Sequence, residues 1–418
     1  MKRAVLAGAN QIYGAERRMK TFPNQLFLDP ECKKPFPFRL PPLGSARFHR
    51  IIVAHGASKA CRAHFGSGSG SLMMDAFLVG DDHLAKRDPP TLFTIGQLNP
   101  HKGFVHVFDD ATLDIVMQTL DTVSDFVTYL SKKEALFTRG IGVIAAGEEE
   151  ILAHYLHHLN AAGEHDFEVP PNCGGLFFQE GTWQLFCIHP QRRAQIEANQ
   201  VSYLWDQLIE KFSYHIMTAT QQYTSSSGPH ESEILLRFLA AENRTRRRML
   251  AHGMLEVINK ANERQRFVRI YQSTKSQEPY YVFLSLPSTH AKSEDEYREV
   301  RRGLLEAYLL VCKRMNPDAQ DIVGIAISPT SESDCSEDLL YLNARDWTAE
   351  LAAEAESLQA DLKILQNVTL IEGRYSEYPK VTARARPRFV PNGRYPRNAP
   401  CGCGSGLKYK KCCIRTSF

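Results

Sequence analysis

The stretch APCGCGSGLKYKKCC, residues 399–413, places four of the ten cysteines of this 418-residue chain within thirteen positions. A segment this short cannot bury enough apolar surface to fold alone. Zinc supplies the missing free energy, because four thiolates at about 2.3 Å form the closed tetrahedral site of a structural, non-catalytic metal. The spacing C-x-C-x8-C-C therefore predicts one structural Zn²⁺ bound by Cys401, Cys403, Cys412 and Cys413.

Residues 397–413 resemble the SEC-C motif, the zinc module that ends the bacterial preprotein translocase ATPase and is appended to many otherwise unrelated bacterial proteins. The family typically reads PCxCGSGxKYKxC followed by His or Cys, and this chain departs from it at Gly402 and Leu407, neither a ligand position. The resemblance implies that the first three cysteines are ligands and that Cys413 fills the His-or-Cys position. It also implies a module that docks on partners, including an acidic chaperone and the ribosome, and does not catalyse.

Charge is distributed unevenly along the chain. Residues 380–418 contain ten Lys or Arg and no Asp or Glu, so the preceding part holds 40 basic and 47 acidic side chains. Four thiolates and one zinc ion contribute −2, which leaves the metallated tail at about +8. This tail is predicted to bind phosphates or carboxylates of an acidic protein, the ribosome or a nucleic acid; the alternative is that its charges only keep it solvated. The residues predicted to contact the partner are Lys408, Lys410, Lys411 and Arg415.

The remaining composition is that of an ordinary soluble protein, with 43% hydrophobic and 23% charged residues. No apolar run approaches the roughly 20 residues that span a bilayer, so no membrane insertion is expected. The other six cysteines are scattered along the chain, which argues against a disulfide framework and predicts a reducing, cytoplasmic compartment.

Periodicity predicts a mixed α+β fold made of two α/β units, a Pro/Arg-rich linker and the small zinc module. The boundaries are 1–190 for an N-terminal α/β domain, 191–374 for a second helical and α/β domain, 375–398 for an extended linker and 399–417 for the module. Predicted strands cover residues 48–55, 92–98, 104–108, 141–145, 267–272, 280–286, 322–328 and 339–343, with a hairpin-like pair at 176–179 and 183–189. Predicted helices cover 1–19, 113–130, 148–160, 192–212, 230–262, 294–315 and 348–365, and Asp109 or Asp110 is expected to cap the second of them.

Residues 11–130 resemble a group of uncharacterised bacterial proteins that often end in a SEC-C motif, through segments such as QIYGAERRMKTFPNQLFLDP, HRIIVAHG and VHVFDDATLDIVMQTLDTVSDFVTYLSKKE. Longer members look nuclease-like, with a strand pair bearing acidic residues and a lysine before a helix like the one that opens this chain. This chain lacks that pair. The resemblance therefore implies a nuclease-related scaffold without a complete active site, and no catalytic residue is assigned. The alternative is a metal-dependent nuclease whose catalytic strands lie upstream of Met1 or are not recognised here.

Three further polar clusters have two interpretations each. A histidine group beside Glu150 is either a metal site or, as we expect, a solvated helix face. The sequence Glu164-His165-Asp166 is either an acid–imidazole pair or, as we expect, a loop. An arginine group near Glu242 either touches nucleic acid or forms a salt-bridged, exposed helix face. The histidines are His154, His157 and His158, and the arginines are Arg244, Arg246, Arg247 and Arg248.

Overall fold

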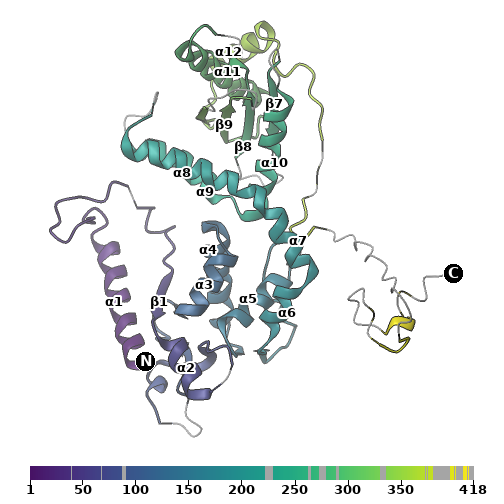
Figure 1. The fold of residues 1–418 in the computed structure, drawn as a ribbon. Coiled ribbons are helices and arrows are strands. Elements are labelled where there is room, and N and C mark those ends of the chain that lie inside the picture. Colours follow the sequence, from purple (N-terminus) through teal and green to yellow (C-terminus); the bar gives the residue numbers. More distant parts are fainter. Residues whose placement is uncertain are drawn as a thin grey trace.

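A computed structural model shows a mixed α+β protein (Figure 1) and confirms the predicted fold class, with three sheets among the residues that it describes. Those residues are 1–38, 40–66, 68–86, 91–221, 229–261, 265–272, 279–288, 291–329, 336–371, 373, 375–379, 396–399, 401, 408–411 and 413. Across these ranges every helix is too short or too polar to span a bilayer.

The first sheet is a parallel pair, β1 (Arg50–Ala54) and β4 (Val105–Asp109). Alternate β4 side chains point to opposite faces, as the period of a strand requires. Val105 and Val107 pack with the apolar face of α1 (Lys2–Thr21), whereas Phe104 and Phe108 join a larger core on the other face. The strand pair therefore lies between an N-terminal helix and the main core of this half of the chain.

The second sheet has the order β3-β2-β5-β6 and joins the same core. Its β2–β3 and β5–β6 pairs are parallel and its β2–β5 pair is antiparallel. The strands are β2 (Met73–Val79), β3 (Thr94–Gln97), β5 (Gly142–Ala145) and β6 (Gly175–Phe178). The helices in this half are α2 (Ala57–Phe65), α3 (Asp110–Thr119), α4 (Val123–Phe137), α5 (Glu148–His157) and α6 (Thr182–Ile188).

The third sheet, β10-β9-β8-β7, is covered on both faces (Figure 1). Along β8 (Tyr280–Ser285), Tyr280, Val282 and Leu284 pack toward α11 (Glu294–Met315) and α12 (Ala349–Asp361). Tyr281 and Phe283 pack toward α8 (Tyr203–Thr218) and α10 (Arg244–Lys260) on the other face. This strict alternation explains why β8 is entirely apolar or aromatic apart from its last residue. The strands are β7 (Phe267–Tyr271), β8 (Tyr280–Ser285), β9 (Asp321–Ile327) and β10 (Glu337–Asn343); the helices are α7 (Pro190–Asn199), α8 (Tyr203–Thr218), α9 (Pro229–Ala241), α10 (Arg244–Lys260), α11 (Glu294–Met315) and α12 (Ala349–Asp361).

The predicted long helix over 113–130 is wrong, because the chain forms two helices there. α3 ends at Thr119, and Thr122 begins α4 by accepting a hydrogen bond from the backbone N–H of Asp125 at 3.0 Å. The predicted cap at the start of α3 is confirmed. The Asp109 side chain accepts from Ala111 N at 3.0 Å and from Thr112 N at 2.9 Å, within a capping box.

The predicted second strand of the hairpin-like pair is also wrong, because residues 183–189 lie largely in α6. Two backbone N–H groups at the start of α6, those of Gly181 and Trp183, donate to the Glu150 carboxylate at 2.8 Å each. Gly181 has φ +94°, which an L side chain rarely adopts, and turns the chain from β6 into the helix. β2, in contrast, was not predicted from the sequence.

The start of the expected linker packs against the body. Glu377 accepts from Gln195 and lies 2.7 Å from His165 Nε2, while Tyr378 donates from its hydroxyl to the Leu156 carbonyl at 3.1 Å. Arg248 donates to the Ser376 carbonyl at 2.5 Å. Residues 375–379 therefore join segments of both halves of the chain; the predicted linker residues 380–395 lie outside the described ones.

Candidate functional site

The described tail residues bring two separated pieces of backbone together. The N–H of Tyr409 donates to the Ala399 carbonyl, and the N–H of Lys410 donates to the Arg397 carbonyl, each at 2.9 Å. Both donors belong to a short 3₁₀ turn, η4 (Tyr409–Lys411). The segment before the first cysteine pair therefore lies beside the segment before the second, which is the arrangement that a site shared by both pairs requires.

Two of the four predicted ligands fall within the described residues. Cys401 is 4% exposed and Cys413 is 8% exposed, and neither forms a disulfide. Burial of two thiols in a segment with almost no apolar side chains fits a metal site better than a small hydrophobic core. The other two predicted ligands, Cys403 and Cys412, lie outside the described residues.

The basic side chains of the tail lie on its outside where they are described. Lys408 and Lys411 are exposed and Lys410 is partly exposed. The two described cysteines of the tail are therefore buried, whereas its described lysines are exposed or partly exposed. Arg415, the fourth predicted contact residue, lies outside the described residues.

The arginine cluster on α10 is salt-bridged but not exposed. Arg244 pairs with Asp121 at 2.8 Å and with Asp206 at 2.5 Å, and Arg247 also pairs with Asp206. Arg244 and Arg247 are both buried. The prediction of an ion-paired face is confirmed and the prediction of its exposure is wrong, because these arginines connect α10 to α8 and to the turn between α3 and α4.

The expected solvated face of α5 is wrong for Glu150, whereas His154 and His158 are partly exposed. Glu150 is 2% exposed because it caps α6, and the His154 ring packs edge-on against Phe178 with 4.9 Å between centroids. His154 also stacks on His158 at 4.2 Å, while His157 remains exposed. Residues 164–166 form the predicted loop.

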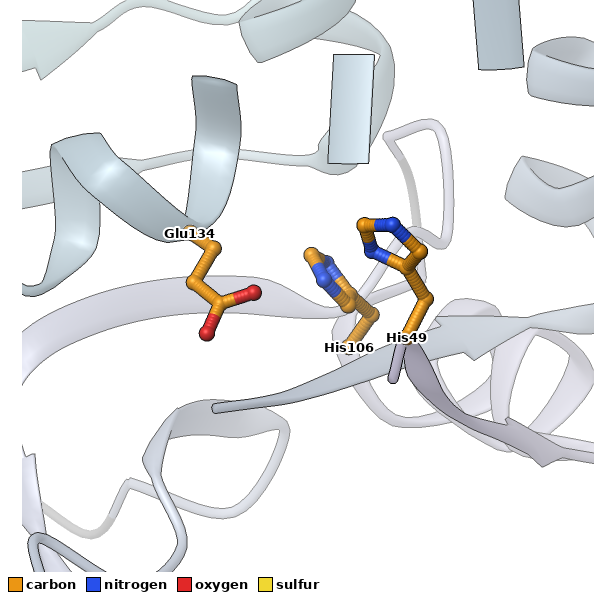
Figure 2. A group of neighbouring side chains, drawn as sticks. All are labelled: His49, His106 and Glu134. Atoms are coloured by element: carbon orange, nitrogen blue, oxygen red, sulfur yellow. The ribbon is translucent and has the colours of Figure 1, made fainter. Parts of the chain in front are cut away.

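A group that the sequence analysis missed lies where β1, β4 and α4 meet. His49 directly precedes β1, His106 is the second residue of β4, and Glu134 lies on α4. One potential ligand atom from each lies within 4.8 Å of the other two. Figure 2 shows the three side chains converging, with His106 between His49 and Glu134. A sequence signal was present, since His106 occupies the centre of the apolar run Phe104–Phe108.

The ring nitrogens of both imidazoles in this group are shielded from solvent. His106 is fully buried, and both ring nitrogens of each histidine are buried without a hydrogen-bond partner. Burial lowers the pKa of His106 to about 2, helped by the nearby Lys133 charge, and burial also lowers the pKa of His49. Both rings are therefore neutral near pH 7.

The described strands do not supply the acid–lysine pair of a nuclease core. No strand among the described residues contains a lysine, and the buried Lys133 of α4 pairs with Glu148 of α5. The carboxyl end of β4, Asp109, is used as a helix cap. These carboxylates and this lysine therefore have structural partners.

Comparison with known proteins gives one match. A family model described as SEC-C motif matches residues 397–415, which include all four clustered cysteines. No curated protein matches the chain. No solved structure matches it either. The chain therefore carries a SEC-C motif at its C-terminal end, on a body for which these comparisons name no relative.

Proposed function

We propose that this chain is a zinc-binding protein whose C-terminal SEC-C module docks on a polyanionic partner. Zn²⁺ is held by Cys401, Cys403, Cys412 and Cys413 and has a structural role. The match of a SEC-C model to residues 397–415 supports this assignment, as does the burial of the two thiols that are described. The body is a nuclease-related scaffold without a complete active site.

The observation that carries the docking proposal is the separation of charge. Ten basic and no acidic residues lie in 380–418, whereas the preceding residues have 47 acidic against 40 basic side chains, an excess of seven negative charges. A polyanion is repelled by that body and attracted by the tail. Zinc binding holds Lys408, Lys410 and Lys411 at and beside the turn η4, and Arg415 adds a further positive charge to the tail sequence. The partner is an acidic protein, the ribosome or a nucleic acid.

The proposal is tested by measuring binding to a single-stranded RNA and to an acidic protein over a range of salt concentrations. The intact chain is compared with a variant that ends at Pro379, which keeps the Glu377 contacts with the body. Removing the tail is expected to abolish binding. Equal binding by the truncated and intact chains would contradict the proposal.

The salt dependence distinguishes the classes of partner. About five phosphate contacts give a log–log slope of roughly −3.5 to −4.5, because each contact releases condensed counterions. An acidic protein carries no such condensed layer, so its slope is shallower. A steep slope therefore favours nucleic acid or the ribosome, and a shallow slope favours a protein partner.

A further inference from the structure

The geometry of β1 and β4 explains why His49 and His106 meet. Ile51 pairs with His106 in the parallel register, and Ile51 packs against the same core as Phe104 and Phe108. His49 is two residues before Ile51, so its side chain leaves the strand on the same face. The two imidazoles are therefore diagonal neighbours, with ring centroids 6.4 Å apart.

Helix α4 places the Glu134 carboxylate beside the face of β1 and β4 that carries His49 and His106. Leu130 and Phe137 lie one turn before and one turn after Glu134, and both are buried in the core that contains Phe104 and Phe108. Side chains three and four positions apart share one face of a helix. Glu134 thus extends from an otherwise apolar helix face toward two imidazoles on an otherwise apolar strand face.

The charged neighbours of this group are already paired. Arg50, next to His49, is held by Glu16 through two hydrogen bonds of 2.6 and 2.7 Å. Lys133, next to Glu134, pairs with Glu148. Among the described residues no salt bridge to Glu134 is formed, and its charge acts at longer range on Arg50 and on His49.

Four buried ring nitrogens without a partner are not accounted for by packing alone. Buried polar atoms are nearly always hydrogen-bonded, and an exception points to a missing water or ion. A cation between His49, His106 and Glu134 would take one nitrogen from each ring and be balanced by the carboxylate, which accounts for two of the four nitrogens. A neutral imidazole offers a metal one nitrogen lone pair, and a carboxylate supplies the compensating charge.

We propose that His49, His106 and Glu134 bind a divalent first-row transition-metal ion, with Zn²⁺ as the best match. Two nitrogens and one carboxylate suit zinc or iron, whereas Mg²⁺ and Ca²⁺ take oxygen ligands. Ligands of one tetrahedral zinc lie roughly 3.4 Å apart. The observed spread of up to 4.8 Å closes by side-chain rotation of His49 and Glu134, both of which are partly exposed.

This site differs in kind from the tail site and does not depend on the proposed docking function. Three protein ligands leave one position of a tetrahedral ion open, as in catalytic zinc sites and unlike a closed four-thiolate site. The open position takes water or a small oxygen donor such as a carboxylate.

The test uses full-length protein carrying both Cys401→Ser and Cys403→Ser, so that the tail cannot compete for metal. Zinc binding is measured by equilibrium dialysis with metal analysis. We expect one equivalent per chain in this variant and two in the wild type. If the variant binds no zinc and the wild type binds one equivalent, the inference is overturned while the tail assignment stands.

Ligand variants in the same background localise the metal. His49→Gln and Glu134→Gln are each expected to weaken binding by at least the roughly 10- to 100-fold that loss of an outer-shell partner costs. Both positions are partly exposed, and circular dichroism checks that each variant folds. His101→Gln, an exposed imidazole before β4, is the matched control and should bind as before. Unchanged affinity in both ligand variants, or an equal loss in the control, contradicts the assignment.

Cobalt substitution identifies the ligand type without any change in the body. Nitrogen and oxygen ligands give Co²⁺ visible absorption without a thiolate charge-transfer band. The double-cysteine variant should show this spectrum, and the wild type should add the charge-transfer band of the tail. A thiolate band in the double-cysteine variant would place the metal on another cysteine and overturn the inference.

Discussion

The tail and the junction of β4 with α4 use buried side chains in opposite ways. Among the described tail residues, Cys401 and Cys413 are the only buried ones, so there is no apolar core to hold the backbone. At the junction, His106 lies between Phe104 and Phe108, in a core built from apolar side chains of several strands and helices. Metal is thus expected to fold the tail, whereas at the junction it only occupies a site that the fold has already formed.

Because of this difference, metal removal is expected to cost the tail far more folding free energy than the junction of β4 with α4. A structural zinc contributes about 10–16 kcal/mol in zinc-finger peptides, more than a segment of this size can replace. At a site inside a folded core, the metal raises the free energy of unfolding only by an amount set by the free metal concentration. This amount is about 2.7 kcal/mol when the metal concentration is one hundred times Kd.

The largest effect is expected from Cys412→Ser. Loss of one thiolate should disorder the tail, while the body keeps its fold because it has its own cores. Hydrogen exchange followed by mass spectrometry should show lost protection after residue 396 and unchanged protection before Pro379. Cys32→Ser, at an exposed cysteine of the body, is the control. Global unfolding of Cys412→Ser would show that the tail supports the body.

The next effect concerns the charge of the tail. Changing Lys408, Lys410 and Lys411 to Gln should lower the salt slope of RNA binding by roughly 2 to 3, since each phosphate contact contributes about 0.7 to 0.9. The matched control changes three exposed lysines of the body, Lys33, Lys34 and Lys59. An equal reduction in both triple variants would indicate non-specific attraction rather than docking by the tail.

His106→Leu is expected to change the free energy of unfolding by a smaller amount. Whether the variant is more or less stable than the wild type depends on whether zinc is present. Without metal, removing a buried unpartnered imidazole should raise the free energy of unfolding by about 1–3 kcal/mol. With saturating zinc, the wild type should recover that difference because it binds the ion and the variant does not. Urea denaturation with chelator and with zinc, in the Cys401→Ser/Cys403→Ser background, measures both. A destabilised variant under both conditions would show that His106 serves packing alone.

The smallest effect is expected from Glu377→Gln, which tests how the tail is joined to the body. Burial opposes protonation of His165, but its hydrogen bond and charge interaction with Glu377 outweigh burial and raise its pKa. A raised folded pKa stabilises the protein below the unfolded value of about 6.5, and this contribution disappears as the pH rises through the folded value. The variant should therefore lose about 0.5–1.5 kcal/mol at pH 5.5 and less at pH 8.5. An equal loss at both values would rule out this linkage.

The sequence predicted elements whose determinants are local. Helix 294–315 was predicted with its observed bounds, since Ser293 caps it and its apolar residues recur at helical spacing. α6 was mistaken for a strand because its N-terminus is capped by Glu150, thirty-one positions earlier. The zinc ligands of the tail are predictable because all four cysteines lie within thirteen consecutive residues. His49, His106 and Glu134 form no motif, because three separate elements must fold before they meet.

The docking proposal is tested most directly by the RNA affinity of Cys412→Ser at one fixed salt concentration. Four thiolates and zinc carry −2, whereas the metal-free variant has largely neutral thiols near pH 7, so its tail is more positive by about two charges. Charge alone therefore predicts equal or tighter binding by the variant. The account predicts weaker binding, because without zinc Lys408, Lys410 and Lys411 are no longer held around one turn. Equal or tighter binding would contradict the claim that a zinc-folded module does the docking.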